Sequence, residues 1–180
     1  MFTKTARWSL GLAGALALIG VVAYAAAALS SLAPSSTQIS GWTALEADKL
    51  AASASDLYKI YDGGDGPWKE AGVTSAFQRY YKNGATRHVL TLIIHKTGSS
   101  SQTAKALFNK KNPALHGQSG YKAVEVAEQA SLATPSTGLS AHLCNKNYYV
   151  SITINGTSAA DVSAAKSFLS AVSAKITKNG

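Results

Sequence analysis

The fold is decided by residues 148–155, which read YYVSITIN. Aromatic and β-branched residues dominate this segment and suit the half-buried surface of a β-sheet. Its side chains alternate between two sets, Tyr148, Val150, Ile152 and Ile154 on one side and Tyr149, Ser151, Thr153 and Asn155 on the other. A period of two residues is that of a strand. We therefore predict a strand at Tyr148–Asn155 that ends at Asn155-Gly156.

The residues after this strand predict a long helix at Ala159–Lys178. Apolar residues recur there at mostly three- or four-residue steps, at Val162, Ala165, Phe168, Leu169, Val172 and Ile176. This spacing places them on one face of a helix. We expect that face to pack on the sheet.

The residues before the strand predict further antiparallel strands. Ser75–Tyr81 and Thr86–His95 flank Asn83-Gly84, a pair that favours a two-residue type I′ turn between paired strands. Weaker alternation follows at residues 121–129 and 131–134, and Leu139–Lys146 leads into the strand at Tyr148. The sequence therefore predicts a hairpin and several more strands.

Two more helices complete the predicted fold. Thr43–Tyr61 shows apolar residues at helical steps, and Ser101–Lys110 follows serines that suit an N-cap, Ser99, Ser100 and Ser101. A loop is expected at Asn112–Gly120. Because strands and helices are segregated along the chain, the expected fold class is α+β, with an antiparallel sheet packed against helices in one domain at residues 42–178.

The N-terminus has the pattern of an export segment. Lys4 and Arg7 precede the uncharged run Trp8–Thr37. Positive residues ahead of an apolar stretch are typical of a signal peptide, and the run also exceeds the about 18–20 residues that span a bilayer. A cleaved signal peptide and a retained inner-membrane anchor helix at residues 9–32 both stay open. We assign residues 1–32 to this segment and 33–41 to a linker, and expect a periplasmic or secreted bacterial protein.

The charge distribution and the cysteine content limit the kinds of partner and of covalent link that we expect. The 180-residue chain has a formal net charge of +8, but its lysines are scattered and only Lys110-Lys111 are adjacent. Scattered lysines form no stripe that suits a phosphate backbone, so no nucleic-acid partner is expected. Cys144 is the single cysteine, which excludes an internal disulfide. The expected partners are a small ligand or an envelope protein, with membrane contact through the N-terminal segment where it is retained.

Four short segments carry a resemblance to a known family. They are DLYKIYDGG at 56–64, EAGV at 70–73, FQRYY at 77–81 and KNYYV at 146–150. Over Trp42–Ile176 the chain resembles an uncharacterised family of exported bacterial domains of unknown function, which is similar to the PsbP-like α/β sandwich. The resemblance implies that fold and no catalytic residue, because the family has no assigned active site. Asp65-Gly66-Pro67 departs from its more helical continuation.

The candidate catalytic pair is Cys144 with His142. Two positions apart on a strand, both side chains point to the same face, near enough for an imidazole to lower the pKa of a thiol. The alternative is a buried structural cysteine beside an exposed histidine, because no third group that would orient the pair is evident.

The candidate metal ligands are Asp62, Asp65 and Glu70. Glycines between carboxylates let the backbone wrap a hard cation, but the spacing is not that of an EF-hand loop. A glycine-rich helix terminator explains the same residues. The histidines show no zinc spacing, and they are His88, His95, His116 and His142. We expect no metal and no cofactor.

Aromatic residues are frequent, and most are expected in the core. Some of them also suit a shallow site for a sugar, lipid or peptide, because a rigid ring gives a large contact area at a small entropy cost. The candidate ligand-binding residues are Tyr61, Trp68, Tyr80 and Tyr149.

The sequence contains no serine-hydrolase motif and no phosphate loop. We therefore predict an extracytoplasmic non-catalytic binding or accessory module of unknown ligand. Two alternatives stay open: a thiol-dependent enzyme or redox protein that uses Cys144 with His142, and a subunit of a surface assembly.

Overall fold

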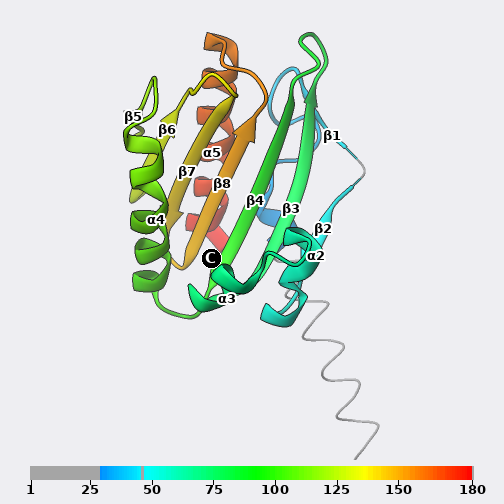
Figure 1. The fold of residues 1–180 in the computed structure, drawn as a ribbon. Helices are drawn as coiled ribbons and strands as arrows, with labels where there is room; N and C mark the ends of the chain where they lie inside the picture. Colours follow the sequence, from blue (N-terminus) through cyan, green and yellow to red (C-terminus); the bar gives the residue numbers. More distant parts are fainter. Residues whose placement is uncertain (1–28, 46, 180) are drawn as a thin grey trace, which may run out of the picture.

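The computed structural model describes residues 29–45 and 47–179. They form an α+β fold, an open antiparallel sheet of eight strands with helices packed on both faces (Figure 1). The strands are β1 (Trp42–Ala44), β2 (Lys49–Ala51), β3 (Val73–Asn83), β4 (Val89–Thr97), β5 (Lys122–Ala123), β6 (Gln129–Ala133), β7 (Leu139–Asn145) and β8 (Tyr148–Ile154). The helices are a 3₁₀ turn (Ala54–Leu57), α2 (Tyr58–Tyr61), α3 (Gly66–Glu70), α4 (Ser101–His116) and α5 (Ala159–Asn179), and residues 29–32 are also helical.

The sheet is built around two hairpins. Its strand order is β1-β3-β4-β8-β7-β6-β5, and β2 also pairs with β3. β3 and β4 form one hairpin and β7 and β8 the other, and the pairing of β4 with β8 joins them. The predicted hairpin around Asn83-Gly84 and the predicted strand from Tyr148 are therefore confirmed.

The hairpin turn is longer than the predicted two-residue turn. Asn83 still belongs to β3, and its backbone N–H donates to the carbonyl of His88. Its side-chain oxygen accepts from the backbone N–H groups of Ala85 and Thr86, both at 2.9 Å. The type I′ prediction is wrong because Asn83 organises a loop with its side chain, and Arg87 takes the left-handed conformation in place of a central Asn-Gly pair.

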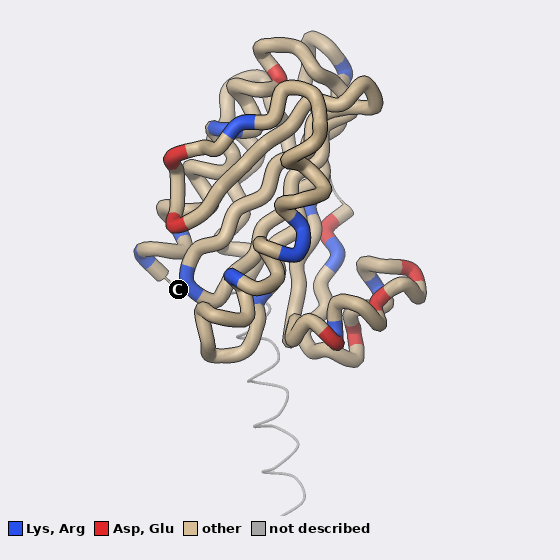
Figure 2. Tube along the Cα trace, turned by 60° about the vertical axis from the view of Figure 1, so that its left-hand side comes forward, with Lys and Arg blue, Asp and Glu red and all other residues tan. Residues whose placement is uncertain are grey.

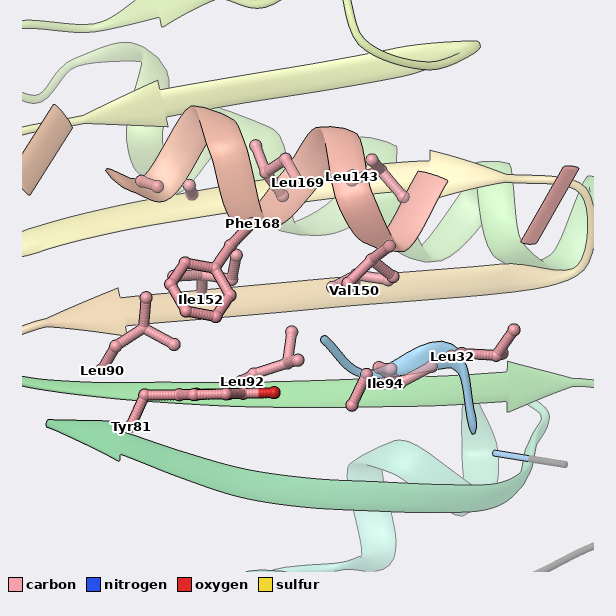
Figure 3. Close-up of a cluster of buried hydrophobic side chains, with 14 of the residues drawn as sticks. Leu32, Tyr81, Leu90, Leu92, Ile94, Leu143, Val150, Ile152, Phe168 and Leu169 are labelled. Carbon is pink, nitrogen blue, oxygen red and sulfur yellow. The ribbon is translucent and has the colours of Figure 1, made fainter. Parts of the chain in front are cut away.

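One face of the sheet is covered by α5, as predicted. Phe168 of α5 contacts the ring of Tyr81 edge to face, with 4.6 Å between the centroids. Figure 3 shows Phe168 pointing toward the sheet beside Ile152 and Leu90. The apolar side of β8 lies in this cluster, with Tyr148, Val150, Ile152 and Ile154 all buried.

The predicted helix at Thr43–Tyr61 is wrong over most of its length. Residues 42–44 and 49–51 are instead short strands paired with different parts of β3. Helical structure begins only at Ala54. The edge of β3 offers unpaired backbone groups, and pairing with them outweighs the weak helical pattern of this segment.

Helix α4 begins where the sequence predicts and ends later. Ser100 is its N-cap, and the hydroxyl of Ser100 accepts from the backbone N–H of Gln102. The loop predicted at Asn112–Gly120 is wrong as far as His116, because the helix continues through Pro113 and buries Leu115.

Residues ahead of Trp42 are tied to the α5 side of the sheet. Leu29, Leu32 and Ala33 are buried in the same core as α5. The ammonium of Lys175 donates to the carbonyl of Ala33 at 2.6 Å, and the hydroxyl of Tyr81 donates to the carbonyl of Pro34 at 2.7 Å. The start of the predicted linker therefore packs on the domain. The predicted export segment falls mostly on residues 1–28, outside the described residues, and within the described ranges no helix has the length and hydropathy to cross a membrane.

Replacement of Leu32 by Ala should destabilise the chain by about 2–4 kcal/mol, because a buried leucine leaves a cavity in a packed core. Denaturant unfolding of the full chain measures the loss, and the exposed neighbour Thr37, replaced by Ala, should change stability by less than about 0.5 kcal/mol. Equal stability of both variants would show that residues 29–33 add nothing to the core.

Candidate ligand-binding site

The second face of the sheet is only partly covered. Helix α4 lies over the β6 and β7 side and also contacts β8 and β4, and α2 and α3 lie at one end of the sheet. The part of β3, β4 and β8 away from these helices has no helix over it in the described part of the chain (Figure 1). We call this surface the open face. Its residues are Gln78, Tyr80, Thr91, Ile93, Ser140, His142, Ser151 and Thr153.

Strand register places these residues in two rows across the sheet. Gln78, Ile93, Ser151 and His142 are successive partners in one row. Tyr80, Thr91, Thr153 and Ser140 form the next row. Because partners on neighbouring strands stand about 5 Å apart and share a face, the rows form a continuous floor.

The floor is polar although β4 and β8 lie in the middle of the sheet. Thr153 is exposed, and Thr91, Ile93, Ser151 and His142 are half-buried. A central strand usually buries apolar side chains on both faces when helices cover both. Here hydroxyl groups alternate with the apolar residues that face α5, so the sequence is matched to an uncovered surface.

An aromatic cluster borders the open face at the end covered by α2 and α3. It consists of Tyr61, Trp68, His95 and Tyr149. The Trp68 ring is nearly parallel to the rings of His95 and Tyr61, with centroids 4.5 Å and 4.7 Å away. The Tyr61 hydroxyl is hydrogen-bonded to Nε2 of His95, and the two rings are nearly parallel. The Trp68 indole therefore stacks on both rings. The cluster is therefore a packed wall.

Hydrogen bonds fix the protonation of His95. Its Nδ1 donates to the carbonyl oxygen of Tyr149 at 3.0 Å, so the proton of the neutral ring lies on Nδ1 and Nε2 accepts from the hydroxyl of Tyr61. Burial lowers the pKa of His95 to about 3, and the charge of Lys111 contributes in the same direction. His95 is thus neutral and acts as a structural partner of the two tyrosines.

His142 and Lys111 extend the cluster toward the open face. The hydroxyl of Tyr149 shares a hydrogen bond of 3.1 Å with Nδ1 of His142. Burial, with the charge of Lys111, lowers the pKa of His142 to about 4. The Lys111 ammonium lies 4.5 Å from the centroid of the Trp68 ring, a cation–π contact on the ring of the wall.

Three lysines, which we call the rim, border the open face, and the residues of the open face itself include no carboxylate. Lys49 is the strand partner of Gln78, Lys82 is the partner of Val89, and Lys111 stands on α4. Several acidic residues lie instead between the 3₁₀ turn and α3, one of the places where Figure 2 shows acidic positions, and there Asp56 is paired with Lys59 and Asp65 with Lys69. The rim of the open face is therefore suited to an anion.

Two features give this surface room and an unused acceptor. A shallow hollow of about 390 Å³ lies over Thr91, Ser140 and Thr153. In the adjacent row, the side-chain oxygen of Gln78 is buried and accepts no hydrogen bond from the described residues. This oxygen lies beneath the surface of the floor, at the β3 end of its row.

The structure brings three of the four aromatic candidates together. Tyr61, Trp68 and Tyr149 meet around His95, and Tyr80 lies on the open face opposite Thr91. The residues that sequence reasoning missed as site residues are His95, Lys111 and Gln78. Strand alternation places His95 and Gln78 on one face with Ile93, but only the packing of α2, α3 and α4 shows that they border one surface.

The thiol candidates share a face but not an activated environment. Cys144 is the strand partner of Tyr149, and His142 is the partner of Ser151 in the next row. His142 bonds to Tyr149, and burial raises the pKa of the Cys144 thiol to about 11. A raised pKa is the opposite of what an attacking thiolate requires.

The carboxylate candidates for a metal have separate structural roles. Asp62 is the left-handed C-cap of α2, and Asp65 precedes α3 and pairs with Lys69. Glu70 is the last residue of α3 and borders a different hollow, between α3 and α4. Across residues 29–45 and 47–179, no group of three or more His, Cys, Asp or Glu side chains is arranged to hold a metal ion.

Acid should destabilise the chain between about pH 6.5 and pH 4. The folded pKa values of His95 and His142 lie below the usual 6.5, so the unfolded chain binds more protons in this range and stability falls as pH falls. Urea unfolding at a series of pH values measures the slope. His95→Gln should flatten it, and the exposed His116→Gln should not. Identical slopes in the two variants would contradict the assigned role of His95.

No protein-family model matches this chain, and no curated protein matches it in sequence.

Proposed function

We propose that this chain is an extracytoplasmic, non-catalytic binding or accessory module that holds its ligand on the open face. The observation that carries the proposal is a polar, uncovered surface at the centre of the sheet, beside a rigid aromatic wall. Ligand sites combine a preformed surface with a few convergent polar groups, and the open face has both.

The groups around the open face support binding more than chemistry. His95 and His142 have lowered pKa values, and the Cys144 thiol is buried with a raised pKa. Burial also raises the pKa of Tyr61 and of Tyr149, which keeps both hydroxyls protonated. General bases work best with a pKa near the working pH, and none of these groups has one.

The extracytoplasmic part of the proposal rests on the sequence. Lys4 and Arg7 ahead of an apolar run are the export pattern, and the resemblance to exported domains with a PsbP-like sandwich points the same way. A helix-flanked antiparallel sheet is the architecture that this resemblance implies.

Nuclear magnetic resonance of the methyl-labelled full chain tests the proposal. Small-molecule fractions of a bacterial envelope extract should shift the methyl signals of Thr91, Ile93 and Thr153. Val150 and Ile152 are the internal control, because they belong to the same sheet but face α5. Shifts confined to the α5 side, or no shift with any fraction, would overturn the proposal.

Alkylation of Cys144 separates the binding module from a thiol enzyme. With a pKa of about 11 against the usual 9.0, the native chain should hold on the order of a hundredfold less thiolate near neutral pH. Iodoacetamide should therefore modify native Cys144 far more slowly than the urea-unfolded chain, as followed by mass spectrometry. Faster reaction in the native chain would favour the thiol-dependent alternative.

A further inference from the structure

We propose that the ligand of the open face is a saccharide that bears carboxylate groups. This inference deepens the proposed function and rests on it, because it names the chemical class bound at the same surface. Its evidence is the hydrogen-bonding groups of the floor, the charge of the rim and the packing of the wall.

The floor presents hydrogen-bonding groups in a regular array. Hydroxyls of Thr91, Ser140, Ser151 and Thr153 lie on three neighbouring strands, and the half-buried His142 imidazole lies at the β7 end of one row. Hydroxyl groups both donate and accept, as sugar hydroxyls do. The hollow of about 390 Å³ over Thr91, Ser140 and Thr153 gives a sugar ring room on this floor.

The lysines of the rim favour a negatively charged ligand. Lys49 of β2 and Lys82 of β3 lie on the β3 side of the floor and Lys111 lies on α4, on the β7 side, and the described floor positions include no Asp or Glu. Lys49 and Lys82 are exposed, and Lys111 is half-buried. Each carboxylate of the ligand gains attraction from the lysine nearest to it and meets no like charge on the floor. A neutral sugar would leave this positive rim unused.

Other anionic ligands fit the same surface less well. Arg79, the arginine of β3, lies on the opposite face and is paired with Asp48, so the strands of the open face supply no forked guanidinium of the kind that suits phosphate. Trp68 has Tyr61 and His95 against one side and Lys111 over its ring, which leaves no free platform for a nucleobase. Few apolar residues face outward, so a lipid chain would find little to contact.

Lys111 links the wall to the ligand. Its ammonium rests over the Trp68 ring, and a cation–π contact of this kind is a weak interaction. A ligand carboxylate beside α4 offers a charge-assisted hydrogen bond, which is stronger. Lys111 is therefore the lysine on which recognition of the acidic sugar depends most.

The test is calorimetric titration of the full chain with short oligomers of galacturonate, compared with the methyl esters of the same oligomers. The acid should bind and the ester should bind at least about tenfold more weakly, since it lacks the charge that the lysines recognise. Added salt should weaken binding of the acid and leave the ester unchanged.

Variants locate the binding. Lys111→Gln and the near-isosteric Thr153→Val should each weaken binding of the acid oligomer, Lys111→Gln by about tenfold. The matched control is Lys166→Gln, an exposed lysine of α5 on the opposite side of the sheet, which should change nothing. Unfolding midpoints equal to that of the parent chain show that the variants are folded, and an unfolded Lys111→Gln leaves Thr153→Val to decide.

The outcomes distinguish this inference from the function on which it rests. Equal binding of acid and ester, or no binding of either, overturns the acidic saccharide. The proposed function survives that result where another component of the envelope extract shifts Thr91, Ile93 and Thr153. Binding of the acid oligomer that is lost in Lys166→Gln and kept in Lys111→Gln overturns the site itself.

Discussion

The pairing of β4 with β8 is the constraint on which the rest of the structure depends. It joins the two hairpins into one sheet, with Leu92 opposite Ile152 and Ile93 opposite Ser151. The side-chain period of a strand is two, so a slip of one residue would turn Val150 and Ile152 outward and carry Ser151 under α5. The buried core and the polar open face are therefore two results of a single register.

The parts of the fold that sequence reasoning predicted are those with strong periodicity. One side of β8 and one side of α5 are buried along most of their length, so apolar residues recur in these segments at regular intervals. β1 and β2 are only three residues long, and their partners on β3 lie between 25 and 41 positions further along the chain, so no local pattern reveals them. The candidate site could likewise be predicted only in part. Residue type was enough to single out Tyr61, Trp68 and Tyr149, whereas the position of Lys111 over Trp68 depends on how α4 and α3 pack.

A rigidly packed aromatic cluster borders the uncovered strands of the open face. The buried, neutral His95 ties Tyr61 of α2 to the backbone of β8, and Trp68 of α3 covers that pair. Short helices such as α2 and α3 have little stability of their own, so these contacts hold them in place. The neighbouring floor can then stay free of helices without loss of the fold, because α5 supplies the core from the other side.

The attachment of residues 29–34 to the α5 side also decides how the domain carries mechanical load. Leu29 and Leu32 are buried against α5, and Lys175 and Tyr81 hold the carbonyls of Ala33 and Pro34. A pull on the chain ahead of Leu29 is therefore resisted by the α5 core, with the whole thickness of the sheet between that point and the open face. Tension applied at Leu29 would therefore enter the domain on the α5 side of the sheet, opposite the surface that we propose for the ligand.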